Sequence, residues 1–183
     1  MWYVIKNATI RKKFKETYEM ITIRTAEKAD VPKLLDIYNY EVLNGVATFD
    51  LQPKTIEERM IWFEEHNIKN HPLIVAVIDN EVCGYASLSP YRTKEAYAAT
   101  VELSVYVDAD YRGRGVATAL MEAIIKLAKE DENTHMVVSV ITHGNEASEK
   151  LHEKFGFDFS GTIHEVGVKF GRYLDIDNFE LRV

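Results

Sequence analysis

The stretch SVYVDADYRGRGVATALMEAIIKLA, residues 104–128, decides the fold. A strand pattern ends at Val107, a loop rich in arginine and glycine follows, and an amphipathic helix pattern begins after Gly115. Glycine lets the backbone approach a ligand closely, and the first turn of a helix offers free N–H groups and a positive dipole end. Together with Arg112 and Arg114, these features indicate a pyrophosphate-binding loop. An ordinary strand-to-helix turn with solvated arginines would give the same pattern, and the spacing is that of neither a Walker loop nor a G-x-G-x-x-G fingerprint.

Strand and helix patterns alternate on both sides of this stretch. Alternating and continuous apolar runs indicate strands, and apolar residues at helical spacing after capping signals indicate helices. The expected strands are 21–26, 73–78, 81–89, 100–107 and 136–141, with further pieces around 157–166 and 174–182. The expected helices begin near Asp30, Thr55, Gly115 and Asn145, and the second is expected to pack through Met60, Ile61 and Trp62. This order predicts a single-domain α/β fold with a mixed central β-sheet and helices on both faces.

Composition narrows the class of protein. A chain of 183 residues fits one domain, and a hydrophobic fraction of 46% allows a sizeable core. The net charge of -7 argues against a nucleic-acid partner bound through a broad basic face. Cys83 is the only cysteine, so no intramolecular disulfide can form; it fits a small core residue in a cytoplasmic protein.

The N-terminal segment is expected to differ from the rest of the chain. No apolar run reaches the roughly 18 residues that a membrane span needs, so no membrane partner is expected. The N-terminus has basic residues and lacks the apolar segment of a signal peptide. We therefore expect residues 1–19 to be an N-terminal arm, solvated and disordered or a product of start-site choice, and residues 20–183 to be the functional domain.

The loop at Arg112 resembles the coenzyme A loop of the GCN5-related N-acetyltransferase (GNAT) superfamily. That loop reads Gln/Arg-x-x-Gly-x-Gly/Ala, which Arg112-Gly-Arg-Gly115-Val-Ala117 matches between a strand and a helix. The resemblance implies acetyl-coenzyme A as cosubstrate, with the pyrophosphate held by backbone N–H groups of the loop. The residues implied in cofactor binding are Arg112, Gly113, Arg114, Gly115, Val116 and Ala117, with Val105, Tyr106 and Val107 beside the pantetheine arm.

A second segment, THGNEASEKLHEKFGF at residues 142–157, resembles the superfamily signature N-x-x-A/S-x-x-L-Y/H-E-x-x-G-F. Asn145, Ser148 and His152 share one helix face by their spacing. The resemblance implies coenzyme contacts for Asn145 and Ser148, and His152 is the candidate donor to the leaving thiolate. Without the resemblance, Asn145 would be a helix cap and His152 a surface histidine.

Three further segments resemble the phosphinothricin and methionine sulfone/sulfoximine acetyltransferases. They are ATFDLQPKTIEER, RTKEAYAATVELSVYV and VGVKFGRYLDI, and the match runs from about Ile21 to the C-terminus. Tyr173 stands where that subgroup usually has tryptophan. The resemblance implies a small amino-acid-like substrate and a homodimer, with the last segment near the shared pocket.

Glu102 is the expected catalytic base. Strand alternation puts it on one face with Ser104 and Tyr106, and a carboxylate within an apolar and aromatic strand needs a reason. A strand glutamate that simply faces solvent is the commoner case, but this one matches the subgroup's catalytic glutamate. Arg92 is expected to pair with the substrate carboxylate, and Tyr97 and Phe49 to wall the pocket.

Two other functions stay open at this stage. An acetyltransferase of protein N-termini or lysines would have an open groove and little use for Arg92. A non-catalytic acyl-coenzyme A-binding module would not need Glu102 or His152. No metal is expected, because His152-Glu153 and His164-Glu165 lack the second histidine of H-E-x-x-H.

Overall fold

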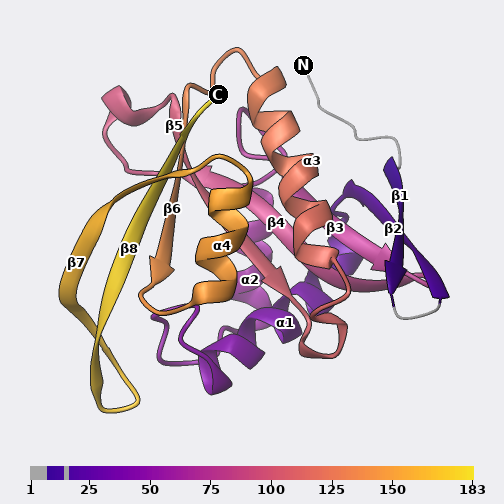
Figure 1. The fold of residues 1–183 in the computed structure, drawn as a ribbon, viewed down its shortest axis with the longest axis horizontal. Coiled ribbons are helices and arrows are strands. Elements are labelled where there is room, and N and C mark those ends of the chain that lie inside the picture. The colour runs from indigo at the N-terminus through magenta and orange to yellow at the C-terminus, as the bar shows by residue number, and fades with distance from the viewer. Residues whose placement is uncertain (1–7, 15–16) are drawn as a thin grey trace.

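The computed structural model describes residues 8–14 and 17–183, and in them one mixed sheet carries helices on both faces (Figure 1). The strands are β1 (Ala8–Phe14), β2 (Thr17–Thr25), β3 (Leu73–Ile78), β4 (Glu81–Pro90), β5 (Thr100–Val107), β6 (Met136–Thr142), β7 (Asp158–Lys169) and β8 (Arg172–Arg182). The α-helices are α1 (Val31–Asn44), α2 (Ile56–Glu64), α3 (Val116–Glu130) and α4 (Glu146–Lys154). The predicted single-domain α/β fold is confirmed.

The sheet runs in the order β1-β2-β3-β4-β5-β6-β8-β7. Neighbouring strands are antiparallel except β5 and β6, which are parallel. In Figure 1, α3 and α4 lie in front of the sheet, α1 and α2 lie behind it, and the β7–β8 hairpin extends along one edge. The parallel pair, β5 and β6, lies in the interior of the sheet, with β4 on one side and β8 on the other.

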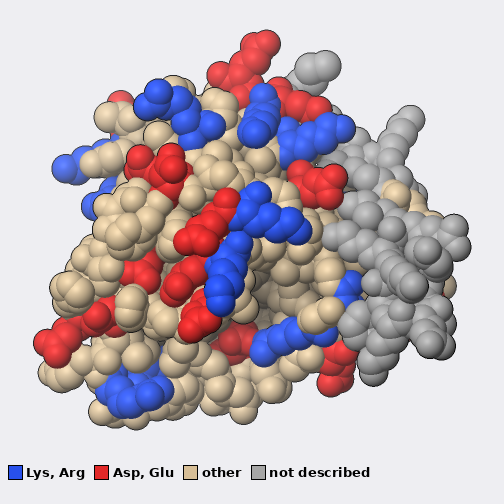
Figure 2. All heavy atoms as spheres, viewed as in Figure 1, with Lys and Arg blue, Asp and Glu red and all other residues tan. Residues whose placement is uncertain are grey.

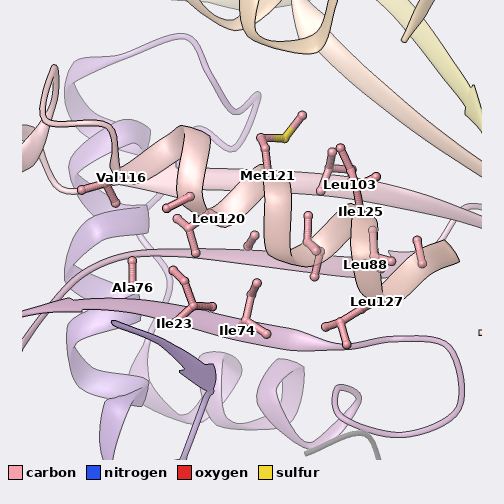
Figure 3. Packing of buried hydrophobic residues seen from close by; sticks show 14 of the residues in the cluster. Ile23, Ile74, Ala76, Leu88, Leu103, Val116, Leu120, Met121, Ile125 and Leu127 are labelled. Carbon is pink, nitrogen blue, oxygen red and sulfur yellow. The ribbon is translucent and has the colours of Figure 1, made fainter. Parts of the chain in front are cut away.

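Two cores hold these layers together. On one face, α3 buries its apolar stripe on the sheet, and Leu120 and Ile125 point at strand residues that include Ile23 and Ile74 (Figure 3). On the other face, α1 packs against alternate strand residues such as Val75. Because β3 is covered on both faces, its sequence is a continuous apolar run rather than an alternating one.

Local sequence signals explain where several elements begin and end. Thr55 and Glu58 form a capping box, in which each side chain accepts a hydrogen bond from the other residue's backbone N–H. Gly45 ends α1 as expected. Asp79 and Asn80 both have positive φ values, of 50° and 66°, as a tight hairpin turn between antiparallel strands requires.

The structure differs from the sequence-based expectation at two places. β2 begins at Thr17 and pairs with β1, so strand structure extends into the segment expected to be an arm. The division of the chain at residue 20 stays a prediction, and its residues 1–7 and 15–16 lie outside the described residues. The expected packing of α2 is confirmed for Trp62, which packs against the same core as α1, and is wrong for Ile61, which is 65% exposed. The buried residue of α2 is Arg59.

Candidate active site

A cleft forms where the two parallel strands separate. β5 and β6 pair only from Thr100 to Glu102, opposite Met136 to Val138. Beyond Glu102, β5 stays with β4 and β6 stays with β8. Within residues 8–14 and 17–183, the edge of β5 from Leu103 onward therefore has no strand partner on that side. A cavity of about 1260 Å³ occupies the gap, lined by both strands and by residues from both helical layers. The cavity therefore connects the two faces of the sheet.

The side of the cavity next to α3 fits an anionic ligand. Gly113 and Gly115 have positive φ values of 72° and 84°, and Gly115 is the N-cap of α3. The N–H groups of the first helical turn have no partner within the helix, and the dipole adds positive potential there. The expected loop residues lie along the cavity except Arg114, whose guanidinium lies 4.5 Å from the Tyr111 ring centroid.

Arg112 has a structural partner. Its guanidinium forms an ion pair with the buried Glu41 of α1, and its Nε donates to the carbonyl of Val107 at 3.4 Å. The Arg112 charge is thus already balanced by a carboxylate from the opposite layer. Anion binding at this loop consequently depends on backbone N–H groups, which is what the two positive-φ glycines permit.

α4 brings a buried histidine to the same side. The Nδ1 of His152 lies 2.8 Å from the Ser148 carbonyl, which can only accept, so Nδ1 carries the proton. Its Nε2 then accepts from the Ser139 hydroxyl on β6 at 2.8 Å. Burial lowers the pKa of His152 and favours this neutral form. Asn145 caps α4 by accepting from the Ser148 N–H at 3.3 Å.

Glu102 lies at the point where the strands diverge. Burial raises the pKa of its carboxyl group, and the positive charge of Arg92 partly opposes this shift. In the β4–β5 register it faces Ser89, whose hydroxyl lies 3.0 Å from the Nε2 of the buried His66. A half-buried carboxylate with a raised pKa, open to a cavity, is suited to accept a proton near neutral pH.

The compartment on the α1–α2 side is aromatic. Tyr85 and Tyr106 stack with ring centroids 5.3 Å apart, and Tyr38 meets Tyr106 edge-on at 5.4 Å. The loop after α1 contributes Phe49, and a Cβ built on Gly167 of β7 would lie 2.4 Å from the Phe49 ring. The β7–β8 hairpin therefore closes over this loop, which gives the compartment a wall rather than an open groove.

Arg92 and Tyr97 lie outside the cavity wall. Both are exposed on the segment between β4 and β5, where Arg92 bonds the Tyr91 hydroxyl at 3.3 Å and its Cζ lies 5.9 Å from the Tyr97 ring centroid. The charge of Arg92 still reaches the site, because it lowers the pKa of Glu102. The other expected site residues except Arg114, including Phe49 and Glu102, line the cavity.

Three residues of the site were missed from sequence. Arg59 and Ser139 line the cavity, and Lys169 of β7 is 2% exposed. The Lys169 ammonium donates to the carbonyls of Thr48 at 2.7 Å and Glu41 at 3.3 Å, which fastens the hairpin to α1 and the following loop. Burial lowers its pKa. The sequence did indicate the position of Arg59, because it stands three residues before Trp62 and so shares one face of α2 with that ring.

Three further features of the described residues concern surface charge, metal ligands and membrane-spanning helices. Lysine and arginine are interspersed with aspartate and glutamate over the face in Figure 2, rather than gathered in one basic patch. Within residues 8–14 and 17–183, no group of three His, Cys, Asp or Glu side chains is placed to hold a metal ion. In the same part of the chain, no helix has the length and apolar character needed to cross a bilayer.

Comparison with known proteins decides the family. The sequence model of the acetyltransferase (GNAT) family matches residues 35–157. The chain belongs to the GNAT family. The predicted enzyme class, an N-acetyltransferase, and the predicted cosubstrate, acetyl-coenzyme A, are confirmed.

Similar GNAT proteins narrow the comparison further. The chain is 40% identical over 163 residues to an L-methionine sulfoximine/L-methionine sulfone acetyltransferase of Pseudomonas aeruginosa, covering 88% of this chain and 94% of that one. It is 41% identical over 165 residues to a phosphinothricin N-acetyltransferase of Streptomyces coelicolor, covering 87% and 95%. A phosphinothricin acetyltransferase from Sinorhizobium meliloti, solved in complex with acetyl-coenzyme A, superposes with a TM-score of 0.84 at 31% identity, covering 89% and 88%.

Proposed function

We propose that this GNAT enzyme acetylates the amino group of a small amino-acid-like substrate of the phosphinothricin, methionine sulfone or methionine sulfoximine type. The observation that carries the proposal is a continuous cavity that extends from the Gly115 loop at the start of α3 to the aromatic compartment beside α1 and α2. The named activities of the similar proteins support the same substrate class. A walled compartment also favours a small acceptor over a protein N-terminus or lysine.

Glu102 is the proposed general base. An ammonium group has no lone pair with which to attack a thioester, so a proton must leave the acceptor first. Glu102 takes this proton, directly or through a water, and the freed amine can then form the new N–C bond as the C–S bond breaks. Acetyl-coenzyme A supplies the acetyl group as its thioester. A β5 N–H near Val105, on the edge that β6 leaves unpaired, is the proposed donor to the developing oxyanion.

His152 is proposed to assist the leaving thiolate through Ser139. Because both ring nitrogens of His152 are engaged inside the chain, the imidazole does not face the cavity with a free N–H. The Ser139 hydroxyl lines the cavity and is the group that can turn toward a sulfur atom. Until the thiolate forms, the Nε2 of His152 accepts the single proton of that hydroxyl; when the hydroxyl turns, it donates that proton to the sulfur instead. Asn145 and Ser148 line the adjoining coenzyme side.

Arg92 is proposed to bind the substrate carboxylate, and Arg92→Ala tests this. A guanidinium binds a carboxylate with two parallel hydrogen bonds. We expect Arg92→Ala to raise KM for the amino acid roughly 10- to 150-fold, the range for a charge-assisted hydrogen bond. The variant should hardly change the slower turnover of the decarboxylated amine. Steady-state kinetics on methionine sulfone and its decarboxylated analogue measure the split, with Lys129→Ala at the exposed C-terminal end of α3 as the control. Equal losses on both substrates would refute the carboxylate role.

The β7–β8 hairpin is the proposed homodimer contact. Its exposed apolar side chains are Phe159, Ile163, Val166, Val168, Phe170 and Tyr173. An apolar surface of this kind is typical of a protein–protein interface. We expect sedimentation equilibrium at micromolar concentration to give about twice the monomer mass of 21.0 kDa. A mass that stays near 21.0 kDa would contradict the dimer.

A further inference from the structure

Arg59 holds a buried charge in the aromatic compartment. It is 5% exposed, and its Cζ lies 3.4 Å from the Trp62 ring centroid and 5.0 Å from those of Tyr38 and Tyr85. The capping box at Thr55 sets the start of α2 so that Arg59 turns toward the sheet. Cation–π contacts of this kind stabilise the guanidinium but satisfy none of its N–H groups.

The hydrogen-bonding capacity of Arg59 is largely unused. Among the described residues, its Nε and Nη2 are buried without a hydrogen-bond partner, and no carboxylate oxygen lies within ion-pair distance. The nearby Asp50 is instead bonded by Tyr38 at 2.6 Å and Lys54 at 3.1 Å. Burial raises the pKa of Tyr85 and the Arg59 guanidinium beside its hydroxyl opposes this rise, but the hydroxyl is likewise buried without a partner at hydrogen-bond geometry. Buried polar groups and charges are costly unless they are paired, so an unpaired cluster at a cavity wall indicates a place for a ligand group.

The unpaired atoms have a defined recognition geometry. Nε and Nη2 lie on the same edge of the guanidinium, so their N–H bonds point in parallel, as in the two-pronged binding of carboxylate or phosphate. The Tyr85 hydroxyl can add a third donor. Three donors on one side suit a group with two terminal oxygens that only accept hydrogen bonds. Carboxylate, phosphinate and sulfone groups all have this chemistry.

The position of Arg59 selects among those groups. It lies over Tyr85, which faces Tyr106 in the β4–β5 register, whereas Glu102 faces Ser89. Four residues along a strand separate the two places by about 13 Å. The α-amino and α-carboxylate groups of an amino acid are bonded to one carbon, so a substrate whose amine lies at Glu102 can approach Arg59 only with the end of its side chain. The side chains of Glu102 and Arg59 must then span the rest of that distance.

We propose that Arg59, assisted by Tyr85, binds the two terminal oxygens of a group at the end of the substrate's side chain and thereby selects acceptors that carry such a group. The inference rests on the proposed function, because it assumes an amino-acid acceptor with its amine near Glu102. It assigns a different task to each arginine: Arg92 takes the α-carboxylate, and Arg59 takes the distal group.

Kinetics on three matched acceptors test the assignment. Methionine sulfone has both groups, methionine lacks the distal oxygens, and the decarboxylated amine of methionine sulfone lacks the α-carboxylate. We expect Arg59→Gln to lower kcat/KM roughly 10- to 150-fold on methionine sulfone and on its decarboxylated amine, and to leave methionine nearly unchanged. Tyr85→Phe, which removes one oxygen and keeps the ring, should show the same selectivity with a loss of roughly 2- to 10-fold.

Other outcomes overturn the inference in distinct ways. An equal loss on all three acceptors would make Arg59 a structural residue. A loss on the two amino acids but not on the amine would assign Arg59 to the α-carboxylate. If the wild type turned over none of the three acceptors, the proposed function would fail. The affinities of the wild type and the variants for methionine sulfone and for methionine could then still be compared by calorimetry with coenzyme A present. In that assay, no preference of the wild type for the sulfone, or a preference that Arg59→Gln and Tyr85→Phe both retain, would refute the inference.

Discussion

Replacing Glu102 by glutamine is expected to lower kcat by about 10² to 10⁴-fold, the usual contribution of a positioned acid–base group. Glutamine keeps the size and polarity of the side chain but cannot take a proton. Coenzyme affinity should stay close to that of the wild type, because the glycine loop lies on the other side of the cavity. Stopped-assay kcat together with calorimetry of acetyl-coenzyme A separates the two effects.

The pH profile gives the same residue a second, independent test. Burial raises the pKa of Glu102, and only the ionised form can act as base. Activity of the wild type should therefore fall as pH decreases through this raised pKa. Removing the charge of Arg92 removes a group that lowers the Glu102 pKa, so Arg92→Ala should move the acid limb to higher pH. A glutamine variant that keeps wild-type kcat at every pH would eliminate Glu102 as base, and Glu81→Gln on the exposed start of β4 serves as control.

Gly115→Glu should abolish most coenzyme binding. Gly115 has a φ of 84°, which residues with a Cβ adopt reluctantly, and it caps α3 where the ligand's negative charge is expected. A glutamate there adds both strain and like-charge repulsion. Calorimetry should show binding largely lost while circular dichroism still reports a folded protein.

A matched glycine elsewhere controls for strain. Gly171, in the β7–β8 turn, has a similar φ of 71°, and a Cβ there would meet nothing within 4 Å. Gly171→Glu introduces the same charge and the same backbone conflict far from the loop. If both variants bound the coenzyme equally well, the loop would not be its binding site.

Most of the fold was predictable because its signals are local. The apolar run at 73–78 and the capping signal at Thr55 each determine the nearby backbone, and each is confirmed. The strand alternation around Glu102 likewise placed its side chain correctly, since Val101 and Leu103 are buried on the opposite face. The division of β5 from β6 was not predictable, because it depends on two strands pairing at only three positions.

The missed residues share a physical cause. Arg59 and Lys169 are long cationic side chains, which are mostly exposed, and their burial depends on partners from distant parts of the chain. The apolar neighbours Met60 and Ile61 pointed to the wrong face of α2. The spacing of Arg59, Trp62 and His66 marks the correct face, but it is convincing only when the aromatic partners on the sheet are known.

The most direct test of the account is a turnover screen of the purified chain with acetyl-coenzyme A. The acceptors are free amino acids, methionine sulfone, methionine sulfoximine, phosphinothricin, polyamines, and peptides with a free N-terminus or a lysine. Release of the coenzyme thiol gives the rate, and mass spectrometry identifies the N-acetylated product. The account predicts the highest kcat/KM for an amino acid acetylated on its α-amino group. Preferential acetylation of peptides, or coenzyme binding without turnover of any acceptor, would contradict it.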